Sequence, residues 1–209
     1  MLEYMRQGGS IMWIIAALSV AALAVAVERL LFFHRASADV EKLEAEFGRA
    51  ISEKDMKAAH AIAEANDSSP CRLFAAALSH WGVDAEDMKL LMEQQVRREI
   101  YRWEKNIFVL EMIGKIAPLL GLLGTVLGMV AMFRSLNVGG HINAAAVTGG
   151  IWKALFTTVA GLTVAIPSII VCGFLNARID SEEETLKRSA DFIIRKHMAS
   201  ESGRDGAQK

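Results

Sequence analysis

A few polar side chains within or beside long apolar runs have the clearest chemical potential in this chain. Thr125 lies in one such run, and Thr157 and Thr158 lie in another, which Lys153 directly precedes. A hydroxyl in a membrane needs a hydrogen-bond partner, and water or a passing proton carrier can supply one. We therefore predict that the three threonines line a path for ions, and Lys153 lies beside that path. The alternative is that the threonines only donate to neighbouring backbone in a packed bundle.

Carboxylates are missing from the same region, since none occurs between residues 116 and 175. A titrating acid on the path would have to come from another chain. The five histidines are scattered, and no HExxH or CxxC spacing is present to hold a metal. Cys71 and Cys172 fall in different predicted layers, so neither a disulfide nor a zinc site is expected. We expect no enzyme activity, no catalytic residue, no metal and no cofactor.

Three apolar runs, at residues 11–27, 116–133 and 154–175, must position these groups. The third run is long enough to cross a bilayer as a helix, and the first two only just reach that length. Ala22 and Ala24 would suit signal-peptide cleavage, but little positive charge precedes the run and it continues to Phe33. We interpret all three as transmembrane helices. A net charge of -1 with 53% hydrophobic residues excludes a basic nucleic-acid binder and an acidic disordered protein.

We predict an all-α integral membrane protein with three transmembrane helices, of which the second and third extend into the cytoplasm, plus a small cytoplasmic helical layer. Lys and Arg concentrate between residues 29 and 115 and after residue 178, which places these parts in the cytoplasm. The predicted segments are a tail and first span (1–35), a cytoplasmic helical region (36–113), a second span (114–136), a short loop on the opposite side (137–147), a third span (148–176) and a cytoplasmic helix and tail (177–209).

Helical periodicity predicts which faces pack. Small residues share one face of the third span, while larger apolar residues fill the others. The second span continues a stripe that starts in a helix capped by Asp84, and no breaker appears before Gly114 and Pro118. We therefore expect one long helix, kinked at Pro118. The residues predicted to pack helices together are Gly121, Gly124, Gly128, Gly161, Ala165, Pro118 and Pro167.

Two motifs carry a family resemblance. Residues 117–129 read APLLGLLGTVLGM, and residues 150–162 read GIWKALFTTVAGL, followed by AIP at 165–167. Together they resemble the MotA/TolQ/ExbB proton-channel family, and most closely its ExbB and TolQ branch. The resemblance covers the three-helix layout and the cytoplasmic insertion as well as the motifs.

This resemblance implies a homopentamer in the inner membrane of a Gram-negative bacterium, with a periplasmic N-terminus and loop and a cytoplasmic C-terminus. The pentamer would enclose a dimer of ExbD- or TolR-like single-span proteins, whose aspartate takes up and releases protons. Proton flow would then drive a TonB- or TolA-like protein at the outer membrane. Nucleic acid is not an expected partner. The alternative is a non-conducting membrane scaffold. A secondary transporter is not expected, because it would need substrate-binding polar groups at mid-membrane and usually internal repeats.

Lys153 departs from the pattern of the family. Relatives in the ExbB and TolQ branch usually have glutamate at this position, and lysine reverses the charge. One interpretation is a lysine that snorkels to the membrane interface beside Trp152. The other is a cation that faces the pore and pairs with a carboxylate of the partner.

Overall fold

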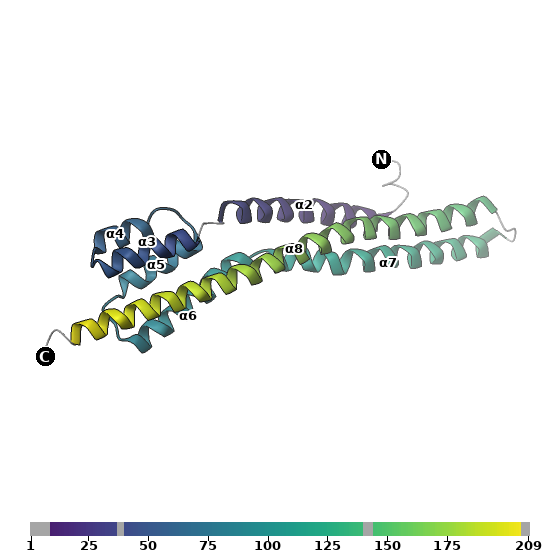
Figure 1. Cartoon of the computed structure of the whole chain (residues 1–209). Helices are drawn as coiled ribbons and strands as arrows, with labels where there is room; N and C mark the ends of the chain where they lie inside the picture. The colour runs from purple at the N-terminus through teal and green to yellow at the C-terminus, as the bar shows by residue number, and fades with distance from the viewer. Residues whose placement is uncertain (1–8, 37–39, 140–143, 206–209) are drawn as a thin grey trace. The chain divides into compact units, whose positions relative to one another are not determined.

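The computed structural model describes residues 9–36, 40–139 and 144–205. Every element in these ranges is an α-helix, which confirms the predicted all-α class (Figure 1). In chain order the helices are α2 (Ser10–Ala36), α3 (Val40–Ser52), α4 (Met56–Ala63), α5 (Ser69–Ser79), α6 (Ala85–Glu104), α7 (Ile107–Gly139) and α8 (Ala144–Asp205).

Three helices are long and apolar enough to cross a membrane, which confirms the predicted number of spans. They are Ser10–Phe33 of α2, Ile107–Arg134 of α7 and Thr148–Ser200 of α8. In their most apolar windows only 17%, 22% and 28% of residues are buried within the chain. Large apolar side chains such as Leu119 and Ile170 are therefore exposed, as expected of faces that meet lipid or other chains.

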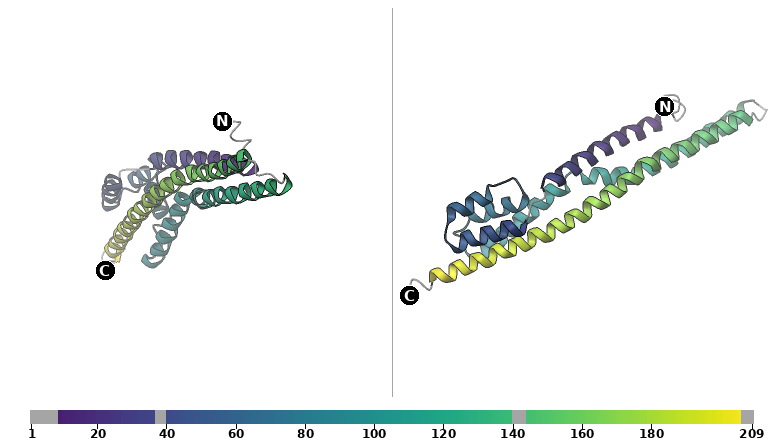
Figure 2. Two further views of the ribbon diagram at one scale, coloured as in Figure 1. Left: turned by 90° about the vertical axis from the view of Figure 1, so that its right-hand side faces the viewer. Right: turned by 45° about the horizontal axis from the view of Figure 1, so that its top comes forward.

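The chain divides into two compact units. The first consists of residues 1–30 and 106–175, and the second of residues 31–105 and 176–209. Within the first unit, α7 and the first part of α8 run side by side in every view (Figures 1 and 2). This pair carries all the threonines and glycines that the sequence singles out.

Side-chain caps define the short helices of the second unit. Asp55, Ser68 and Asp84 each accept a hydrogen bond from a backbone N–H in the first turn of α4, α5 and α6 respectively. The predicted cap at Asp84 is confirmed. α3 ends at Ser52 and α5 begins at Ser69, directly after its cap at Ser68.

An aromatic core and one buried ion-pair network hold the second unit together. Phe47 stacks on Phe74 with 4.4 Å between ring centroids, and the fully buried Trp103 donates to the Ser69 hydroxyl at 2.9 Å. Arg72 bridges the buried Glu99 and the exposed Asp67, at 2.6 Å in both cases. The hydrogen bond and the charge of Arg72 lower the pKa of the Asp67 carboxyl.

The long helix predicted from Asp84 through the second span is wrong, because the structure breaks it into α6 and α7. Asn106 has a φ of 64°, a left-handed conformation that asparagine tolerates better than most residues. Its side-chain amide donates to Glu28 at 2.9 Å, which fixes the break in place. Pro118, by contrast, lies inside α7 and Gly114 does not interrupt it. Trp103 and Ile107 are both buried, so the apolar stripe resumes after the break.

The third span continues into the second unit as predicted. α8 includes both the apolar run and the buried residues Ile179, Leu186 and Ile193. It also extends to Asp205, so most of the segment predicted as a helix and tail at 177–209 is helix. The loop predicted at 137–147 is helical up to Gly139 and from Ala144 onward, and residues 140–143 lie outside the described ranges, as does the tail at 1–8.

Candidate functional site

Close backbone contact between α7 and α8 is the main feature of the candidate site. A methyl group placed at Gly121 would lie 2.9 Å from the Cα of Thr158, and one at Gly124 would lie 2.6 Å from the Cβ of Thr157. Real side chains do not approach this closely, so both positions require glycine. The two glycines therefore bring the threonine backbone of α8 directly against α7.

The same contact extends along both helices. A methyl at Gly128 would lie 3.2 Å from the Cβ of Ala154, and one at Gly161 would lie 3.2 Å from the Cα of Gly121 and still closer to the carbonyl oxygen of Ala117. Within the chain, these small faces are filled by the neighbouring helix.

The three threonine hydroxyls all donate to backbone carbonyls. Thr158 Oγ1 donates to Gly121 across the helix pair at 3.1 Å, and Thr125 Oγ1 donates to Leu122 at 2.7 Å. Thr157 is 1% exposed and donates to Ala154 at 2.7 Å. These bonds are those of the packed-bundle alternative. A role in an ion path stays a prediction, and of the three residues Thr158 and Thr125 are half-buried and so accessible in part.

These hydroxyls can form only one further kind of hydrogen bond, as acceptors. A threonine hydroxyl has one proton to donate and two lone pairs that accept. Because the protons of Thr158 and Thr125 are engaged, each oxygen is left as an acceptor. Such an oxygen can receive a hydrogen bond from a protonated carboxylic acid, whereas an ionised carboxylate has no proton to offer it.

Lys153 lies at the end of this contact, one residue before the buried Ala154. Its side chain is exposed, and its amine comes near Gly9, at the start of α2. The adjacent Trp152 is also exposed and stacks on Phe156, with 6.3 Å between centroids. Within the described ranges Lys153 has no ion-pair partner, so both interpretations of this residue stay open.

The other predicted packing residues differ in burial. Ala165 is 1% exposed, Pro118 is half-buried, and Pro167 is exposed. Pro167 and Ser168 line a small pocket of about 240 Å³ together with residues of α2 and α7. This pocket contains hydroxyls but no charged side chain among its lining residues.

Sequence reasoning missed one packing residue of the first unit. Gly114, interpreted as a helix breaker, is a packing residue, because a methyl there would lie 2.8 Å from the Ile169 side chain. Its spacing of seven from Gly121 was the available signal. At the other end of this unit, the adjacent residues Glu28 and Arg29 of α2 form an ion pair at 2.5 Å, with Arg29 only 4% exposed.

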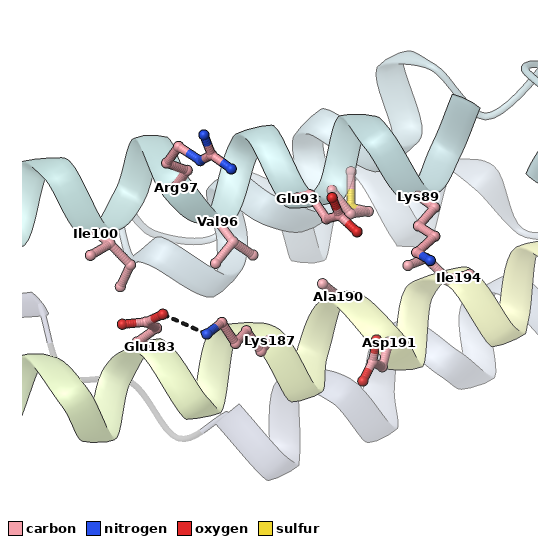
Figure 3. Close-up of a pocket in the computed structure, with 11 residues that line it drawn as sticks. Lys89, Glu93, Val96, Arg97, Ile100, Glu183, Lys187, Ala190, Asp191 and Ile194 are labelled. Carbon is pink, nitrogen blue, oxygen red and sulfur yellow. Dashed lines mark ion pairs between the residues drawn. The ribbon is translucent and has the colours of Figure 1, made fainter. Parts of the chain in front are cut away.

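The second unit contains a groove between α6 and the last part of α8 (Figure 3). It has a volume of about 490 Å³ and an apolar floor that includes Val96, Ile100 and Ala190. Charges of both signs line it, and Lys187 pairs with Glu183 across one helical turn. A lining with both signs does not select for the charge of a ligand.

The amino-acid sequence matches known proteins over most of its length. Residues 52–188 match the MotA/TolQ/ExbB proton channel family. The putative biopolymer transport protein ExbB-like 1 of Synechocystis sp. is 34% identical over 82% of this chain and 68% of its own length. The putative biopolymer transport protein ExbB homolog of Methanothermobacter thermautotrophicus is 29% identical over 89% of this chain and 66% of its own. Biopolymer transport protein ExbB of Neisseria gonorrhoeae is 41% identical over 36% of this chain and 34% of its own.

Proposed function

The chain belongs to the MotA/TolQ/ExbB proton channel family, and from that premise we propose that it is an ExbB- or TolQ-like subunit of a motor driven by the proton gradient. The motor lies in the inner membrane, with the N-terminus periplasmic and the C-terminus cytoplasmic. Copies of the chain form a pentamer around a dimer of an ExbD- or TolR-like single-span protein. The assembly drives a TonB- or TolA-like protein and is not an enzyme.

The observation that carries the proposal is the hydroxyl of Thr158 in a span without carboxylates. No acid occurs between residues 116 and 175, so the titrating group belongs to the partner. Thr158 Oγ1 donates its proton to the Gly121 carbonyl, so it can only accept further hydrogen bonds. It therefore stabilises the partner's carboxyl group when that group is protonated and neutral, which is the form that crosses an apolar region at lower cost.

Tight packing supports a channel that does not leak. One charge moving across 100 mV yields about 2.3 kcal/mol, so a path that lets ions pass freely would lose the energy that drives the motor. α7 and α8 meet at backbone distance along Gly121, Gly124 and Gly128. That contact leaves no room for water between these two helices, and proton transfer is confined to the face shared with the partner.

The second candidate is a passive scaffold, and one observation favours it. Thr125, Thr157 and Thr158 all donate within the chain, as they would in a bundle with no ion path. The two candidates differ in what the hydroxyls of the half-buried threonines are for. A scaffold needs only their hydrogen bonds to backbone, whereas the motor also uses their free lone pairs.

Proton flux in vesicles tests the proposal. The chain is co-purified with its single-span partner and reconstituted, and acidification is followed after a potential is imposed, beside empty vesicles. Thr158→Val keeps the shape but removes both the bond to Gly121 and the acceptor for the partner's acid. Loss of the second bond, about 0.5–1.5 kcal/mol, should lower flux about two- to tenfold. Thr158→Ser keeps the hydroxyl and should conduct like the parent.

A matched control comes from the same helix. Thr163 is exposed and donates to the Val159 carbonyl, and it is not on the predicted path. Thr163→Val makes the same chemical change and should leave flux unchanged. If the parent complex conducts no more than empty vesicles, the scaffold is the better account. Parental flux in Thr158→Val would remove this threonine from the path.

A further inference from the structure

We propose that the second unit contains a binding site for a small organic phosphate, in a pocket between the α3–α4 turn and the last turns of α8. This site is separate from the ion path and does not depend on the proposed function. The pocket has a volume of about 580 Å³, within the range of about 300–1,000 Å³ typical of ligand sites. It is lined by Ile51, Ser52, Lys54, Met56, Trp81, Lys196, Ala199 and Ser200.

The charges in the lining have one sign. Lys54 and Lys196 are its charged residues, and no carboxylate is among the residues that line the pocket. Asp55 follows Lys54 in sequence, but its carboxylate accepts from two backbone N–H groups at the start of α4. Lys196 Nζ donates to the Ser52 hydroxyl at 3.2 Å, which holds the amine at the pocket. The lining therefore favours an anion, unlike the groove of mixed charge in Figure 3.

Lys54 occupies a backbone position that normally belongs to glycine. Its φ is 58°, in the left-handed region. Its N–H donates to Ile51 and the next N–H, of Asp55, donates to Ala50, which is the Schellman pattern that closes a helix. Glycine is the usual residue at this position because a side chain is strained there. Among the described residues the other non-glycine with positive φ is Asn106, whose type tolerates it.

A strained lysine that lines a pocket suggests a use for its amine. Residues held in rare backbone conformations concentrate at functional sites, where the side chain is needed despite the cost. The amine of Lys54 makes no hydrogen bond that would account for its retention within the described part of the chain. An anionic ligand between the two lysines would account for it.

The rest of the lining indicates the ligand class. The two ammonium groups suit the oxygens of a phosphate, whereas the hydroxyls of Ser52 and Ser200 already donate to the carbonyls of Gly48 and His197. Ile51, Met56 and Trp81 provide an apolar wall for the body of the molecule. The shared chemistry is a phosphate ester on an apolar or flat body, which a soluble nucleotide or an anionic phospholipid could provide.

Calorimetry on the full-length protein in nanodiscs of zwitterionic lipid tests the site. The probes are adenosine monophosphate, inorganic phosphate and adenosine, which separate the charged group from the body. We expect saturable binding of adenosine monophosphate, weaker binding of phosphate and none of adenosine. Lys54→Gly and Lys196→Met should each weaken binding at least tenfold. Lys57→Met removes a charge from α4, outside the pocket lining, and should bind like the parent.

Lys54→Gly also separates binding from folding. It restores the residue that the backbone prefers, so its unfolding midpoint should equal or exceed that of the parent while binding is lost. A lipid source is tested by native mass spectrometry, which counts the phosphatidylglycerol retained by the parent and by Lys54→Gly. Loss of retained lipid only in the variant would support the site with a lipid headgroup as the ligand. Unchanged affinity and unchanged lipid retention in Lys54→Gly would overturn the proposal. So would no binding of any soluble probe together with equal lipid retention in the parent and in Lys54→Gly.

Discussion

A single methyl group at Gly161 should disrupt the contact between α7 and α8. In Gly161→Ala the new Cβ would meet the backbone of Ala117 well inside van der Waals distance, and it would lie 3.2 Å from the Cα of Gly121. Backbone atoms cannot turn aside as a side chain does, so the two helices must separate. Overpacking of this kind costs about 1–3 kcal/mol.

Gly173→Ala provides the matched control on the same helix. A methyl group at Gly173 would meet no atom within 4 Å in the chain. Alanine is favoured over glycine in a helix by about 1 kcal/mol, so this variant should be as stable as the parent or slightly more stable. The two substitutions are chemically identical and gain the same helix propensity, so their unfolding free energies should differ by the cost of overpacking, about 1–3 kcal/mol.

Unfolding in mixed detergent micelles measures this difference, and proton flux of the reconstituted complex measures its consequence. We expect Gly161→Ala to unfold earlier and to lose flux, because the hydrogen bond from Thr158 to Gly121 crosses the same contact. If Gly161→Ala and Gly173→Ala unfolded at the same detergent fraction, the close approach of α7 and α8 would not be the packing of this protein.

Three further predictions concern other parts of the chain. Lys153→Met should weaken partner co-purification or motor-dependent growth if the amine pairs with the partner, and parental results in both assays would assign it to the membrane interface. Asn106→Ala should lower the free energy of unfolding by about 1–3 kcal/mol through backbone strain and the lost bond to Glu28. Asn106→Gly should lower it by less, because glycine adopts a positive φ without strain. Equal losses in the two variants would show that backbone strain at residue 106 does not matter. Because Arg72 lowers the folded-state pKa of Asp67, the stability from this pair is present above pH 3.8 and is lost as pH falls through the lower folded value. Asp67→Asn should remove that acid dependence, measured as the unfolding midpoint against pH. The difference from the parent should be small, because the Asp67 side chain is 88% exposed.

Periodicity predicted the faces of the membrane helices well. Helical spacing puts six residues on one face of the third span, of which five are buried and Thr158 is half-buried; the five are Ala154, Gly161, Ala165, Ser168 and Cys172. The short helices were also predictable, since caps such as Asp84 act within one turn and depend on local sequence alone. What periodicity could not provide was the identity of the neighbour, because a small face suits any helix that approaches it. The chain's own α7 fills that face.

The break at Asn106 was not predictable from the pattern, because the apolar stripe continues in phase on both sides of it. At the break, Asn106 donates to Glu28, a residue far away in sequence that no local pattern indicates. The same limit applies to the strained turn at Lys54, where the residue type predicts no left-handed conformation. Local signals predict regular structure, and these two exceptions depend on tertiary contacts or on a side chain retained against the backbone preference.

The unbroken backbone of α8 has a mechanical consequence. The chain passes between its two units at residues 30/31, 105/106 and 175/176. At 175/176 the hydrogen-bond ladder of α8 continues, so a twist or push applied at one end is transmitted along the helix. At 105/106 the ladder is interrupted, and the torsions of Lys105 and Asn106 can absorb a rotation. α8, like α2 at 30/31, therefore connects the two units through continuous helix, and of the three connections the one from α6 to α7 is the one that can bend.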